Sequence, residues 1–165
     1  MILGMSLPTF TLLHVVISLV AIVAGMVVVL GMLGSNRLAG WTAFFLATTV
    51  LTSATGFLFL FTRLLPSHIV GIISLVVLAI AIIALYFCRL TGAWRWIYIA
   101  SAVLALYLNV FVLVVQAFQK ISFLKPLAPT QSEPPFIAAQ GVTLLIFIAL
   151  GVLALRSFHP APGNR

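Results

Sequence analysis

Residues 68–88 read HIVGIISLVVLAIAIIALYFC, an apolar run in which His68 is the only basic side chain. A helix needs about 20 mostly apolar residues to cross the hydrocarbon core of a bilayer. Four more runs meet this requirement, so the sequence predicts transmembrane helices at 8–33, 41–62, 68–88, 97–117 and 136–155. Continuous apolar runs argue against a membrane β-barrel, whose strands alternate. We therefore expect an all-α polytopic membrane protein, and the short connections predict antiparallel neighbouring helices.

The composition supports this fold class. Of 165 residues, 64% are hydrophobic and 5% are charged, whereas a soluble domain draws about a quarter of its residues from Asp, Glu, Lys and Arg. We therefore expect no soluble domain. Residues 1–156 should form a single transmembrane domain with a proline-rich outer loop at 119–135, followed by a disordered tail at 157–165.

The charges predict the orientation and the partners. Short loops on one side of the membrane receive Arg37, Arg89, Arg95, Arg156 and Arg165, and those on the other side receive Arg63, Lys120 and Lys125. Because Lys and Arg favour the cytoplasmic side, we expect the N-terminus outside and the C-terminus in the cytoplasm. The net charge of +7 reflects missing acids, since Glu133 is the only carboxylate side chain. We interpret this positive charge as favouring contact with anionic lipid head groups and not the binding of nucleic acid.

Polar side chains inside the apolar runs are costly and should face the bundle interior. In the helix at 97–117 and just beyond it, one face is marked by a spacing of alternating four and three residues. Its members are Tyr98, Ala102, Ala105, Asn109, Val112, Gln116 and Gln119. The helix at 41–62 carries hydroxyls at Thr48, Thr49, Thr52, Ser53 and Thr55, which favour close helix packing. The amides are either hydrogen-bonded contacts between helices or the lining of a ligand cavity.

Several of these polar residues are predicted to gather in the outer half of the membrane. His14 should lie about 9 Å inside the first helix at 1.5 Å per residue, and His68 at the outer mouth of its own helix. The sequence therefore predicts a polar pocket under the proline-rich loop. Its candidate ligand-binding residues are His14, His68, Asn109, Gln116, Glu133 and Gln140.

The residue types limit the chemistry of this pocket. The chain has no Asp, no HExxH and no GxSxG motif, so we assign no catalytic residue and expect a non-catalytic protein. No cofactor is predicted. The preferred function is a membrane subunit or a binder of a quinone or lipid-like ligand, with another membrane protein or a second copy as partner. One alternative is a redox protein that binds a quinone or holds haem b between His14 and His68, since bis-imidazole ligation of haem needs two such residues. Another is a small transporter.

Four segments carry a resemblance to a known family. They are GWTAFFLATTVLTSATGFLF at 40–59, PSHIVGIISLVVLAIA at 66–81, GAWRWIYIASAVLALYLNVFVLVVQAFQK at 92–120 and LAPTQSEPPF at 127–136. Between about His14 and Gln140 the chain resembles a family of small, uncharacterised multi-pass inner-membrane proteins from proteobacteria. The resemblance implies a bacterial inner membrane, and it carries over no functional residue.

Overall fold

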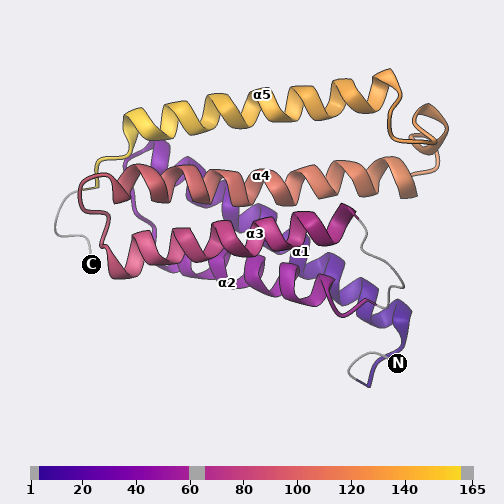
Figure 1. Ribbon diagram of the computed structural model, residues 1–165, viewed down its shortest axis with the longest axis horizontal. Helices are drawn as coiled ribbons and strands as arrows, with labels where there is room; N and C mark the ends of the chain where they lie inside the picture. The colour runs from indigo at the N-terminus through magenta and orange to yellow at the C-terminus, as the bar shows by residue number, and fades with distance from the viewer. Residues whose placement is uncertain (1–3, 60–65, 161–165) are drawn as a thin grey trace.

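A computed structural model describes residues 4–59 and 66–160, and the all-α fold class is confirmed. Five α-helices lie within these described residues, and Figure 1 shows their arrangement. They are α1 (Leu7–Leu33), α2 (Ala39–Gly56), α3 (Pro66–Ile82), α4 (Trp94–Lys120) and α5 (Pro134–Ser157). A π-helical turn, η1 (Ile83–Phe87), extends α3, and a 3₁₀ turn, η2 (Lys125–Leu127), lies between α4 and α5.

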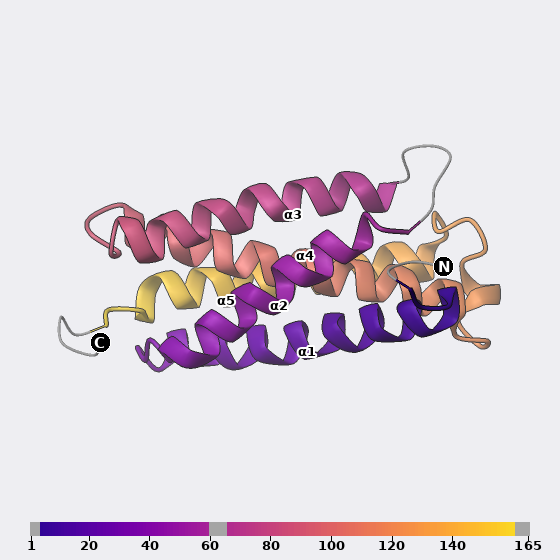
Figure 2. The same cartoon turned by 90° about the horizontal axis from the view of Figure 1, so that it is seen from below.

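The helices run alternately between two ends of an elongated bundle (Figures 1 and 2). Each packs against the next in sequence, and α1 also contacts α4 and α5, so the predicted antiparallel neighbours are confirmed. We call one end the C-terminal end; it contains the connections 34–38 and 88–93 and residues 158–160. The N-terminal end contains residues 4–6, 57–59 and 121–133.

The helix boundaries follow local signals in the sequence. Ser6 caps α1 by accepting a hydrogen bond from the Thr9 backbone N–H at 3.3 Å, and Pro8 stands in the first turn, where its missing N–H costs nothing. Pro134 and Pro135 begin α5 in the same way. Four of the predicted helices begin and end within about three residues of the observed ones, when η1 is counted as the last part of the third helix.

The second helix differs most from its prediction. It ends at Gly56 instead of residue 62; residues 57–59 form a turn, and residues 60–62 lie outside the described part of the chain. A high content of Thr and Ser reduces its hydropathy. Among the described residues, four helices are long and apolar enough to cross a membrane: α1, α3 continued through η1, α4 and α5. These four support a helical membrane protein, and α2 is not one of them.

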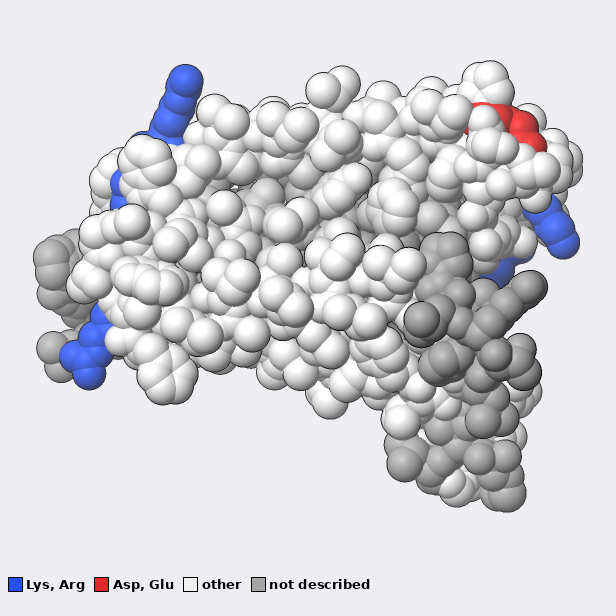
Figure 3. Space-filling model, viewed as in Figure 1, with Lys and Arg blue, Asp and Glu red and all other residues white. Residues whose placement is uncertain are grey.

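Charged side chains keep to the two ends. Figure 3 shows Lys and Arg at both extremities, Glu at one of them, and an uncharged surface between. The described basic residues fall into the two predicted groups, Arg37, Arg89, Arg95 and Arg156 at the C-terminal end and Lys120 and Lys125 at the N-terminal end. Arg63 and Arg165 lie outside the described residues. The uncharged surface between the two ends is what contact with the hydrocarbon core of a bilayer requires of a protein.

Burial is uneven across the bundle. In the most apolar 18-residue window of α4, 39% of the residues are buried, against 6% for α5. Only Phe147 and Ala154 of α5 are buried. Helix α5 therefore lies at the edge of the bundle, and most of its apolar side chains are left to face lipid.

The first residues of the predicted tail make defined contacts with the bundle. Phe158 is 1% exposed, and its ring centroid lies 6.2 Å from that of Tyr98. Arg95 Nη1 donates to the Phe158 carbonyl, and the His159 backbone N–H donates to Ser35 Oγ at 2.9 Å. These contacts join the segment after α5 to the start of α4 and to the 34–38 connection, which are distant in sequence, so no local pattern predicts them. Residues 161–165 lie outside the described chain.

Candidate functional site

Hydroxyl groups of α2 connect it to three other helices. Thr49 Oγ1 accepts from Asn109 Nδ2 of α4 at 3.4 Å, Ser53 Oγ donates to Ser74 Oγ of α3 at 3.2 Å, and Thr55 Oγ1 bonds to His14 Nδ1 of α1 at 2.8 Å. Thr49, Ser53 and Ser74 are all buried. The predicted role of these hydroxyls in helix packing is confirmed, and the structure adds which residue each one contacts.

His14 is held in a defined orientation. Thr55 Oγ1 lies 2.8 Å from His14 Nδ1 and also within reach of the Leu51 carbonyl at 2.7 Å and the Thr52 carbonyl at 3.2 Å. When the hydroxyl donates to one of these carbonyls, its oxygen accepts from His14 Nδ1–H, and the neutral ring of that tautomer carries its lone pair on Nε2. The Phe59 ring stands edge-on to the imidazole, with centroids 5.2 Å apart. His14 is half-buried, so this arrangement leaves a hydrogen-bond acceptor of fixed direction near the N-terminal end.

His68 occupies a different environment. It is 5% exposed in the first turn of α3, and its ring centroid lies 5.9 Å from that of Phe57. His14, on α1, contacts Thr55 and Phe59, whereas His68, on α3, contacts Phe57 at the end of α2. The structure therefore places the two imidazoles on helices that both pack against α2.

The predicted inward face of α4 is confirmed, with a gradient along it. Tyr98, Ala102 and Ala105 are at most 1% exposed. Asn109 and Gln116 are only half-buried, and Gln119 beyond them is exposed. The α4 face is therefore closed, that is fully buried, at the C-terminal end, and open, that is partly exposed, at the N-terminal end, where the amides lie.

Gln140 joins α5 to this open region. Its Nε2 donates to the Phe111 carbonyl of α4 at 3.1 Å, and its Oε1 is buried without a hydrogen-bond partner in the described part of the chain. Thr52 Oγ1 of α2 is a second buried oxygen without a partner among the described residues. Such oxygens are costly in an apolar setting unless a donor reaches them.

Glu133 is engaged within its own loop. Its Oε1 accepts from the Thr130 backbone N–H at 3.0 Å and from Thr130 Oγ1 at 2.8 Å, and its Oε2 accepts from the Ser132 N–H at 3.1 Å. Desolvation alone would raise the pKa of Glu133, but the hydrogen bonds from Thr130 and Ser132 outweigh it and lower the pKa. All of these contacts lie within the loop itself.

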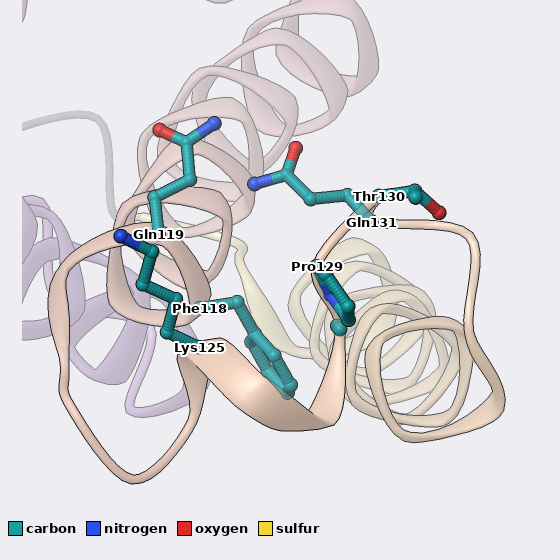
Figure 4. A pocket seen from close by; sticks show the side chains of 7 residues that line it. Phe118, Gln119, Lys125, Pro129, Thr130 and Gln131 are labelled. Carbon is teal, nitrogen blue, oxygen red and sulfur yellow. The ribbon is translucent and has the colours of Figure 1, made fainter.

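The loop forms a hollow that sequence reasoning missed. It measures about 280 Å³ and lies between the end of α4 and the 121–133 connection (Figure 4). Its lining residues are Phe118, Gln119, Lys125, Ala128, Pro129, Thr130 and Gln131. None of these is among the six candidate residues. The four prolines in the predicted range 119–135 indicated a shaped connection, but proline content alone does not specify a concave surface.

The candidate residues thus sit in several contacts spread over four helices and a loop. No group of three or more His, Cys, Asp or Glu side chains suited to a metal ion occurs in the part of the chain that the structure describes. Comparisons with protein-family models, with curated proteins and with solved structures gave no match for this chain. Function therefore has to be argued from geometry.

Proposed function

We propose that this chain is a non-catalytic, five-span inner-membrane protein without a soluble domain, which binds a hydrophobic ligand at its outer end. The N-terminal end faces outward and the C-terminal end faces the cytoplasm, as the distribution of Lys and Arg favours. On this topology α2 is the fifth span, its threonines screened by α1, α3 and α4. The resemblance to small proteobacterial inner-membrane proteins supports the same location.

One observation carries the proposal: polar groups remain accessible or without a partner where the α4 face opens. Asn109 and Gln116 are half-buried there, and Gln140 Oε1 is buried with no hydrogen-bond partner within residues 4–59 and 66–160. Ligand sites combine apolar walls with a few polar groups that fix orientation. A quinone or lipid-like molecule between α4 and α5 would supply apolar bulk against α5 and a donor or a water for Gln140.

Extraction and mass spectrometry of the purified protein test this function. Protein isolated in mild detergent should release a hydrophobic molecule near one equivalent, and Gln140→Leu should lower that content about fivefold, the equivalent of one hydrogen bond. Thr143→Val is the matched control, because the Thr143 hydroxyl already donates to the Ala139 carbonyl at 2.8 Å. Folded wild-type protein free of any such molecule would overturn ligand binding and leave the membrane-subunit role, which copurification of a stoichiometric partner or a second copy would test.

A redox function is the second candidate, and the His14 orientation favours it. An imidazole whose Nδ1–H is held by a hydrogen bond presents Nε2 as an iron ligand or as an acceptor for a hydroquinone. His14 and His68 would hold a haem b if the turn at 57–59 let both reach one iron. An absorption spectrum with a Soret band that is lost in both His14→Ala and His68→Ala would establish this function, and a colourless folded protein would end it.

A further inference from the structure

The hollow under the 121–133 connection has a composition that suits one class of ligand. The lining combines an ammonium group from Lys125 and side-chain amides from Gln119 and Gln131 with the apolar surfaces of Phe118 and Pro129. Figure 4 shows the Phe118 ring between Lys125 and Pro129, with the two glutamine side chains extending above it. A volume of about 280 Å³ equals roughly nine waters at about 30 Å³ each, enough for a phosphate and the carbons esterified to it.

The charge of the hollow is positive. The only carboxylate of the chain, Glu133, points its oxygens at Thr130 and Ser132, so it does not form an ion pair with Lys125. Gln131 Nε2 donates to the Val115 carbonyl at 3.4 Å, which holds the loop against α4. Lys125 therefore stands on the 3₁₀ turn η2 without an ion pair among the residues that the structure describes.

The position of the hollow matches the level of lipid headgroups. It begins at Phe118 and Gln119, within the last turn of α4, and the next element, α5, starts at Pro134. The apolar side chains of α5 below it are largely exposed, among them Ile137, Leu144 and Leu145. An acyl chain can follow this surface while its phosphate stays at the level of Lys125.

We propose that this hollow binds a phosphate-bearing molecule of net negative charge through Lys125 and Gln119, with Phe118 and Pro129 contacting the carbons next to the phosphate when the ligand is an ester. The site differs from the Gln140 site proposed above and does not depend on it. The same chemistry is offered by the headgroup of an anionic phospholipid and by free inorganic phosphate.

Binding measurements on the purified protein distinguish these sources. Melting temperature and native mass spectra would be recorded with phosphatidylglycerol, with phosphatidylcholine and with inorganic phosphate, each titrated into neutral detergent. Stabilisation and adducts with phosphatidylglycerol alone identify the lipid headgroup, and an equal response to inorganic phosphate identifies the free anion. Equal responses to phosphatidylglycerol and phosphatidylcholine with none to phosphate would overturn the proposal.

Two lysine variants separate the site from general surface charge. Lys125→Gln should weaken phosphatidylglycerol binding about fivefold, the effect of one basic residue at an anionic surface. Lys120→Gln is the control, since Lys120 lies at the same end of the molecule and does not line the hollow. Equal weakening by both variants would show a diffuse electrostatic effect and reject a site. Both side chains are exposed, so neither change should disturb folding, and an unchanged melting temperature without lipid checks this.

Discussion

The two ends of the bundle are built in opposite ways. At the C-terminal end, Phe158 and Tyr98 are buried together, and Arg95 and Ser35 bind the backbone of a segment far away in the sequence. At the N-terminal end, the 121–133 loop satisfies Glu133 from within itself and leaves a hollow against α4. A closed end stabilises the fold, whereas an open end with amides has room for a ligand.

The largest expected effect comes from removing the buried ring at the closed end. Phe158→Ala should lower the free energy of unfolding by about 3 kcal/mol, because it leaves a cavity beside Tyr98. Phe123→Ala is the control at the open end, where the ring is 72% exposed and the change should stay within about 0.5 kcal/mol. Equal losses in a denaturation series in mixed micelles would remove the contrast between the ends.

A glycine pair tests packing along the bundle. A Cβ on Gly25 would lie 2.6 Å from Leu106 Cδ1 and 2.7 Å from Phe45 Cε2, and both side chains are fully buried, so Gly25→Ala should cost about 1–3 kcal/mol. A Cβ on Gly56, near the open end, would meet His14 Cε1 at an ordinary 3.7 Å, so Gly56→Ala should be tolerated. Thermal melting of both variants gives the comparison, and a tolerated Gly25→Ala would show that α1, α2 and α4 are less tightly packed than described.

The polar contact between α1 and α2 should have a smaller effect. Thr55→Val removes the hydroxyl that accepts from His14 Nδ1 and should cost about 0.6–1.7 kcal/mol, the range for interhelical hydrogen bonds in membranes. Thr11→Val is the control, because that hydroxyl donates only to the Leu7 carbonyl of its own helix. A double-mutant cycle with His14→Leu isolates the pair, and a coupling energy of zero would mean that the two side chains do not interact.

Glu133 should have the smallest effect, and a pH-dependent one. Because its pKa is lowered in the folded protein, its carboxylate stabilises the fold above the ordinary carboxyl pKa of about 4.3 and loses this contribution as the pH falls through the lowered value. Glu133→Gln should therefore melt slightly below the wild type near pH 7, and the two melting temperatures should converge under acidic conditions. A difference that grows on acidification would contradict the assigned hydrogen bonds.

The sequence was a good guide where the signal is local. Continuous apolar runs placed four spanning helices, and the spacing from Tyr98 to Gln116 placed the inward face of α4, since both depend on residues within a few turns of each other. The end of α2 at Gly56 was missed because Phe57, Leu58 and Phe59 continue the apolar run, and hydropathy does not register a turn. For the candidate site, the sequence identified the end of the bundle where polar groups gather but not which groups meet.

By itself the sequence determined that lipid surrounds this protein. Glu133 is its one carboxylate side chain and its apolar runs are long enough to span a membrane, so the chain has too little charge to cover a water-exposed surface. Only the tertiary structure decided that Glu133 binds Thr130 and Ser132, that His14 binds Thr55, and that Phe158 closes one end. The physical reason is range. Partition into lipid is a sum over neighbouring residues, whereas a hydrogen bond or a packed ring depends on the rotation and separation of helices, which no single segment specifies.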